Sequence, residues 1–129
     1  DAMTAAQFFA KRNKRDFGIW LAGWGADSGD MSSPLKALLA TPNRDKGMGT
    51  TNPGGYSNAK VDELTEKGLA TVDDGERARL FALASKTAME DYGAIPLHFE
   101  LTTWASKKTL SYVPRTDQNT LAMGVKPAK

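Results

Sequence analysis

The chain has 129 residues, of which 40% are hydrophobic and 25% are charged, with 17 basic and 15 acidic side chains. This length suits one domain that buries about two thirds of its unfolded surface. The formal charge of +2 gives no reason to expect nucleic acid or anionic lipid as a partner. No apolar run approaches the ~20 residues that span a bilayer, and the absence of cysteine excludes disulfides and thiol catalysis.

The first third of the chain predicts a helix, a buried strand and a second helix start. Residues 4–14 form an amphipathic pattern with Thr4 as the N-cap and a basic last turn. Residues 17–24 are almost unbroken in their apolar character, which is typical of a strand buried on both faces. After a turn-rich stretch, Ser32 or Ser33 can cap a short helix that has Pro34 in its first turn.

The middle of the chain predicts a long loop and two helices. Residues 41–56 are rich in glycine, proline and polar residues, so we expect no regular structure there. Asn58 is a good N-cap for a helix that runs to about Ala70. Asp73 and Glu76 resemble a capping box at the start of a further helix, which we expect to end near Gly93.

The last third of the chain predicts one strand and an irregular tail. Apolar residues alternate with polar ones over residues 95–101, and a proline lies near the start of this run. Beyond Trp104 only isolated apolar residues occur, and we expect residues 126–129 to fray. The element order favours a mixed α/β fold in which helices pack on an incomplete sheet. The two predicted strands need partner strands that this chain does not supply.

The residues that could perform catalysis or bind a metal are few. The single histidine, His98, lies on the polar side of a predicted strand, and we interpret it as structural. We predict no catalytic residue, no metal site and no cofactor, because the acidic clusters are explained by helix caps and solvated helix faces. The basic residues 11–15 have the character of a solvated helix end, so no nucleic-acid surface is predicted.

The segment from Trp20 to Asp30 combines a predicted strand end with an aromatic ring, small residues and a carboxylate. Ligands favour such places in α/β proteins, since loop backbones converge at the carboxyl ends of strands. Asp27 could hold a cation there. From local chemistry alone, an equally ordinary reading has Trp24 as a core aromatic residue and Asp27 as a turn residue, and that reading is slightly favoured.

A resemblance to a known family favours the ligand-binding reading of this segment over the core and turn reading. The motifs that carry it are residues 16–27 (DFGIWLAGWGAD), residues 56–62 (YSNAKVD), residues 77–81 and residues 94–98 (AIPLH). In this order and spacing they resemble the C-terminal part of family 5 extracytoplasmic solute-binding proteins, the peptide and nickel receptors of ABC importers. The resemblance implies a type II periplasmic-binding-protein fold with two lobes. Residues 1–106 would then be part of the second lobe, and residues 107–129 a segment that crosses toward the missing first lobe.

The resemblance also implies a function and a site. The function is binding of a peptide or other small solute between the lobes and delivery to a membrane permease. The site would consist of Trp24, Gly25, Ala26 and Asp27, with Asp27 meeting the ligand's ammonium group. The chain would then be periplasmic or otherwise extracytoplasmic, lipid-anchored in a Gram-positive organism, and its true beginning would lie upstream. Nickel is disfavoured, since only one imidazole is available. After Asp27 the sequence departs from the pattern of common peptide-binding members, so the ligand itself stays open.

Two alternatives belong to other functional classes. The first is a small stand-alone hydrolase that uses Asp27 or Asp30 with His98 as acid and base, which requires those groups to reach one substrate. The second is an interaction module that binds a partner through an exposed apolar surface. A lobe cut from its protein would also expose such a surface, so non-native self-association is expected as well.

Overall fold

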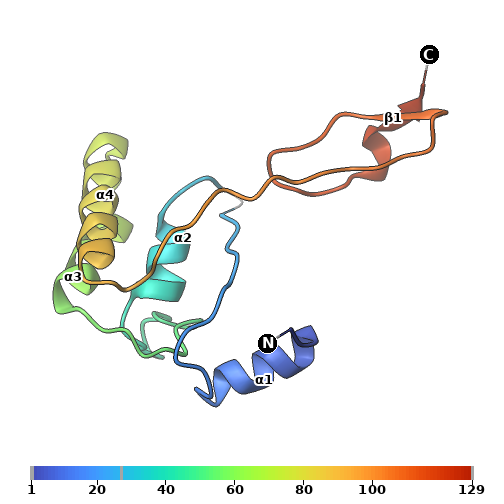
Figure 1. Cartoon of the computed structure of the whole chain (residues 1–129). Helices are drawn as coiled ribbons and strands as arrows, with labels where there is room; N and C mark the ends of the chain where they lie inside the picture. The colour runs from blue at the N-terminus through green and yellow to red at the C-terminus, as the bar shows by residue number, and fades with distance from the viewer. Residues whose placement is uncertain (1, 27, 129) are drawn as a thin grey trace. The chain divides into compact units, whose positions relative to one another are not determined.

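The computed structural model describes residues 2–26 and 28–128. The chain divides into two compact units, Asp1–Pro96 and Leu97–Lys129. Helices make up the first unit, and a small two-stranded sheet is the regular structure of the second (Figure 1). The chain is therefore a mixed α and β structure, while the expected division after Ser106 stays a prediction.

Three helices confirm the sequence-based boundaries. Helix α1 spans Ala5–Asn13 and begins with a capping box between Thr4 and Gln7. Helix α3 spans Ala59–Ala70, where the Asn58 side chain accepts hydrogen bonds from two backbone N–H groups of the first turn. Helix α4 spans Asp74–Glu90 and is capped by Asp73. Each cap supplies an acceptor to donors that have no partner within the helix, which fixes where the helix begins.

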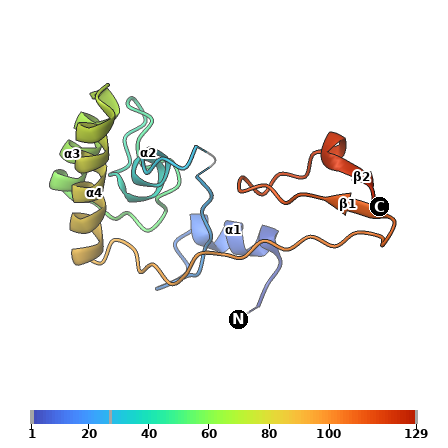
Figure 2. The same cartoon turned by 90° about the horizontal axis from the view of Figure 1, so that it is seen from above.

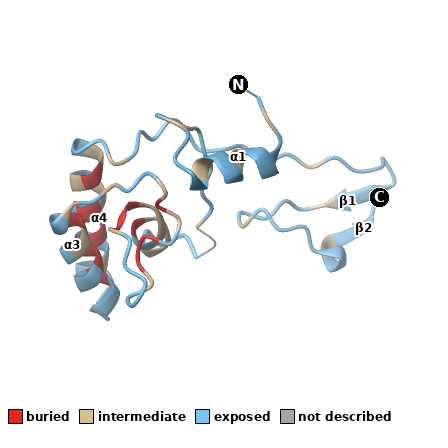
Figure 3. Ribbon diagram, turned by 90° about the horizontal axis from the view of Figure 1, so that it is seen from below, coloured by how far each residue is buried: buried red, intermediate tan, exposed pale blue. Residues whose placement is uncertain are grey.

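The hydrophobic core lies where α3, α4 and the segment 35–39 meet, and Figure 3 shows the buried residues gathered on these elements. Its buried members are Leu35, Leu39, Val61, Leu64, Leu80, Phe81, Ala84 and Ala88. Gly68 of α3 lies so close to the Phe81 ring that a Cβ atom there would clash with the ring. The absent side chain thus lets the two helices approach closely.

The short helix predicted after the turn-rich stretch forms with a different cap. Helix α2 spans Ser32–Pro34 and continues into a π-helical turn, η1, at Leu35–Leu39. Neither Ser32 nor Ser33 is its N-cap; that position is Met31, which makes no side-chain cap bond. The acceptor comes from Asp30, whose Oδ1 receives the N–H of Ser32 at 2.6 Å.

The loop of residues 41–56 is irregular, as predicted, apart from an isolated bridge between Asn43 and Met48. Buried Asn52 organises it. The Asn52 amide nitrogen donates to the carbonyl groups of Ala40 and Tyr56, at 3.0 and 2.8 Å, while its oxygen accepts the N–H of Gly55 at 3.0 Å. One side chain therefore satisfies both ends of the loop.

Residues 17–24 and 95–101, predicted as strands that need partner strands from outside this chain, form no strand here. Neither run is paired in a ladder among the described residues, and the apolar side chains they carry are largely exposed. Ile19 is 79% exposed, Leu97 67% and Phe99 99%. A strand needs a neighbour to satisfy its backbone groups, and no described segment lies in ladder register beside either run. Helices α3 and α4 consequently pack against each other and against the segment 35–39, and not on a sheet.

The irregular tail expected beyond Trp104 is also wrong in part. Strand β1 (Leu110–Tyr112) pairs antiparallel with β2 (Val125–Pro127), so residues 125–127 are held in a ladder (Figure 2). A 3-10 turn, η2, spans Ala122–Gly124. The ring of Tyr112 lies against Gly124, and its hydroxyl donates to the carbonyl of Asn119 at 2.9 Å. Contacts between residues distant in the sequence therefore order a stretch of low local propensity.

Candidate functional site

The approach to the predicted site, residues 15–20, is held against the loop of residues 41–56. A Cβ atom on Gly54 would lie 2.9 Å from Cη2 of Trp20, so glycine is needed for the indole to pack there. The guanidinium of Arg15 lies in ordinary van der Waals contact with Gly55, with Nη2 3.4 Å from the place that a Cβ would take. The segment is thus held by side-chain packing and not by a sheet.

Three of the predicted ligand-binding residues, Trp24, Gly25 and Ala26, lie in an irregular segment before α2 that is largely exposed. Trp24 is 42% exposed, and its Nε1 donates to Oγ of Ser33 at 3.1 Å. Gly25 is open, with no heavy atom of the described residues within 4 Å of the place a Cβ would take. The carbonyl of Ala26 accepts the N–H of Gly29 at 2.8 Å. Asp27, to which the amine-binding role was assigned, lies outside the described residues.

Trp24 is therefore not the core aromatic residue that local chemistry favoured. Part of its indole faces solvent, while the indole nitrogen is fixed by a hydroxyl from α2. A partly exposed, oriented aromatic ring beside small residues can stack on a ligand or on another protein surface.

Asp30 closes the segment with two interactions that the sequence did not predict. Its Oδ2 pairs with Nη2 of Arg77 at 3.0 Å, in addition to the bond that its Oδ1 accepts from Ser32. Hydrogen bonds from Ser32, together with the charge of Arg77, hold the pKa of Asp30 below its ordinary value. The carboxylate therefore stays ionised and engaged, which makes it a poor proton donor. The Asp-x-Ser spacing was a local signal for the cap; no local signal pointed to Arg77.

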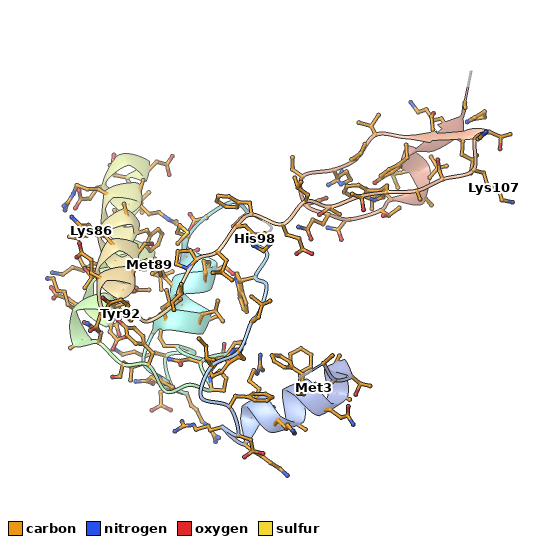
Figure 4. All side chains as sticks on the ribbon, viewed as in Figure 1. Met3, Lys86, Met89, Tyr92, His98 and Lys107 are labelled. Atoms are coloured by element: carbon orange, nitrogen blue, oxygen red, sulfur yellow. The ribbon has the colours of Figure 1, made fainter. Side chains whose placement is uncertain are left out.

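The hydrolase alternative takes its acid and base from different units of the chain, with Asp30 in the first and His98 in the second. His98 is exposed on the extended segment that follows α4 (Figure 4), and no hydrogen bond of its side chain is recorded within the described residues. In the same residues, no group of three or more histidine, aspartate and glutamate side chains could hold a metal ion. None of the described helices has the length and hydropathy needed to cross a membrane.

Surface hollows occur elsewhere in the helical unit. Two adjoining hollows share Lys46, Met48 and Glu66 in their walls, and the Lys46 ammonium pairs with Glu66 at 2.6 Å. Neither hollow is lined by a residue of the segment 20–30. The predicted binding residues that the structure describes, Trp24, Gly25 and Ala26, are thus separate from both hollows.

Comparison with known proteins gives one consistent similarity. The chain is 30% identical over 115 residues to the glutathione-binding protein GsiB of Escherichia coli (strain K12) and to that of Shigella flexneri, and 29% identical to that of Shigella dysenteriae. These matches cover 85% of this chain. The similarity is to a binding protein.

This similarity is distant and partial. The chain spans 22% of the length of these curated relatives, so it corresponds to a small part of each. No protein-family model matches the chain, and no solved structure matches it. The comparisons therefore show similarity to part of a glutathione-binding protein, in keeping with the resemblance seen in the sequence.

Proposed function

We propose that this chain is part of a family 5 solute-binding protein of an ABC importer and that it supplies one wall of the ligand cleft. The observation that carries the proposal is the similarity to glutathione-binding proteins over 115 residues. Of the motifs of the resemblance, residues 16–26 belong to the irregular stretch before α2, residues 56–62 lead into α3, and residues 94–98 follow α4.

The exposed apolar segments support this proposal. Residues 17–24 and 95–101 have the composition of buried strands, yet Leu21 is 72% exposed and Leu101 90%. Burying apolar surface contributes about 25 cal/mol per Å², so runs of this kind are stable when another surface covers them. In the proposed protein they are strands of an α/β lobe that is completed by chain outside these 129 residues.

The function proposed is capture of a small solute bearing a free amine, of which peptides and peptide-like molecules such as glutathione are examples. The two lobes would close around the solute and present it to a membrane permease, and no chemical step falls to this chain. Such a protein works outside the cytoplasm. Trp24, Gly25 and Ala26 would line the cleft, and Asp27 would pair with the ammonium group of the ligand.

The first test identifies the ligand. Native mass spectrometry of the intact protein should detect a co-purifying small solute, and calorimetry should then measure its affinity together with that of glutathione. If the intact protein retains no solute and binds neither glutathione nor free dipeptides, the proposed function is wrong.

The second test concerns Asp27. In the intact protein, Asp27→Ala should weaken an amine-bearing ligand by about tenfold or more, since one charge-assisted hydrogen bond contributes about 1.5 to 3 kcal/mol. The matched control is the same ligand with its amine acetylated, whose affinity should be low for the parent and unchanged by the substitution. Equal affinities of Asp27→Ala and the parent for the free amine would exclude Asp27 from this role.

A further inference from the structure

The ion pair between Arg77 and Asp30 joins helix α4 to the end of the candidate binding segment. The two residues are 47 positions apart, and their side chains meet at 3.0 Å while each is about one third exposed. The two oxygens of the Asp30 carboxylate have different partners: Oδ2 pairs with Arg77, and Oδ1 accepts the N–H of Ser32. The same group therefore contacts α4 and starts α2.

Arg77 is itself held by the core. Its guanidinium carbon lies 5.3 Å from the centroid of the Phe81 ring, one turn further along α4. The ring is 3% exposed and is fixed against Gly68 of α3. A guanidinium stacked on an immobile ring has little freedom, so the position of the Asp30 carboxylate is set by the packing of α3 on α4.

A short series of contacts leads from Asp30 to the candidate ligand surface. The N–H bound by Asp30 belongs to Ser32, and the next residue, Ser33, accepts the indole N–H of Trp24 at 3.1 Å. A shift of the start of α2 would therefore move the hydroxyl that orients Trp24. The indole is the one large side chain among the predicted ligand-binding residues, so its direction matters most for a ligand.

We propose that Arg77 is a positioning residue for the binding segment: through the Asp30 carboxylate it fixes the start of α2 and with it the Trp24 indole. The inference rests on the proposed function for its consequence, which is preorganisation of the cleft wall. A preorganised side chain loses less conformational entropy when a ligand binds. Arg77 contributes in this way without touching the ligand.

A residue with a purely structural role would affect the free energy of unfolding and not the orientation of the Trp24 indole. Among the described residues, the buried Nε of Arg77 has no hydrogen-bond acceptor, which is a cost that a methionine at this position would not carry. Replacing Arg77 with methionine keeps the packing on Phe81 and should leave the cooperativity of unfolding intact. The orientation of Trp24 should change all the same, and that change separates positioning from stability.

The experiment labels the intact protein with 5-fluorotryptophan and assigns the Trp24 fluorine resonance from its loss in Trp24→Phe. Four single variants and one double variant are compared with the parent. Arg77→Met removes the ion pair, and Asp30→Asn also removes it but keeps an oxygen for Ser32. Arg79→Met is the matched control, because Arg79 is an exposed arginine of the same helix that pairs with Glu76. Arg77→Lys is a further variant that keeps the charge.

Arg77→Met and Asp30→Asn should each shift or broaden the Trp24 resonance, their combination should add nothing further, and Arg79→Met should match the parent. Arg77→Lys should fall between Arg77→Met and the parent. With glutathione as the probe, Arg77→Met should weaken binding by about fivefold, and Arg79→Met should not. An unchanged Trp24 resonance in Arg77→Met would overturn the inference, and so would an equal change in Arg79→Met. Absence of glutathione binding by the parent would count against the proposed ligand alone, because the fluorine spectra decide the role of Arg77 without a ligand.

Discussion

Gly68 and Gly93 show how two glycines serve close packing and not backbone freedom. Neither is among the glycines with positive φ. Gly68 accommodates the Phe81 ring, and a Cβ on Gly93 would lie 2.8 Å from Cζ of Tyr56. The left-handed residue at the end of α4 is Tyr92, with φ 55°, and not the glycine that follows it. The sequence correctly located the end of this helix near Gly93, but the reason for the glycine is the Tyr56 ring.

Gly68→Ala should lower the free energy of unfolding by about 1 to 3 kcal/mol, since an overpacked core costs more than the ~1 kcal/mol that alanine gains in helix propensity. Urea unfolding of the intact protein measures this difference. Gly75→Ala is the control, because Gly75 lies in the exposed first turn of α4 and its Cβ would meet only Asp73, at 3.4 Å. If both substitutions stabilise the protein equally, the close packing of α3 on α4 is wrong.

Tyr56 should make stability depend on pH in the alkaline range. Burial of the phenol, followed by its hydrogen bond to Asp91 and the charge of that carboxylate, raises the pKa of Tyr56 from 10.0 to about 12. Because the folded pKa lies above the unfolded one, the stabilisation is complete below pH 10 and is lost as the pH rises toward 12. Ultraviolet absorbance titration of the parent minus Tyr56→Phe should show the late ionisation; a difference centred near the ordinary tyrosine pKa would contradict it.

At the scale of elements, the start of α3 is tied to the end of α4 by a single amide. The Oδ1 of Asn58 accepts from the N–H groups of Lys60 and Val61, while its Nδ2 donates to Asp91 at 2.8 Å. Capping and cross-helix bonding thus use opposite ends of one side chain. The sequence predicted the cap, which is local, and gave no sign of the bond to a residue 33 positions away.

Substitutions of Asn58 can separate these two contributions. Asn58→Ala removes both and should lower the free energy of unfolding by about 1 to 2 kcal/mol. Asn58→Asp keeps a capping oxygen but places a second carboxylate beside Asp91, so it should also destabilise at neutral pH, and 1 M salt should reverse part of that loss through screening. Denaturant unfolding at low and high salt provides the measurement. An Asn58→Asp protein as stable as the parent at low salt would show that the contact with Asp91 contributes nothing.

At the scale of the whole molecule, the described chain packs α3, α4 and the segment 35–39 into a core and leaves its most apolar extended runs uncovered. Val72 and Phe99 are almost equally exposed, at 94% and 99%, but their surroundings differ. Val72 is a single residue in the link between α3 and α4, whereas Phe99 lies within an alternating apolar run. The proposed function implies that a sheet covers Phe99 and does not cover Val72.

Phe99→Asp should therefore destabilise the intact protein by about 2 to 4 kcal/mol, as expected for a charge placed in a buried site, and Val72→Asp should change stability by less than about 0.5 kcal/mol. Unfolding of the two variants by urea makes the comparison. The 129-residue chain alone should self-associate as its concentration rises, which sedimentation velocity can detect. Equal stability of the two variants would mean that Phe99 is not covered in the intact protein.

The sequence by itself determined what depends on neighbouring residues: the helices at 5–13, 59–70 and 74–90, their capping residues, and the irregular loop between Thr41 and Tyr56. Helix caps and 3.6-residue periodicity are local, so they can be read without the fold. Only the tertiary structure decided whether the apolar runs are paired, why Gly68 and Gly93 are glycine, and which residue holds Asp30. A ladder, a ring packed on a backbone and an ion pair each need a partner far along the chain, and no local pattern names that partner.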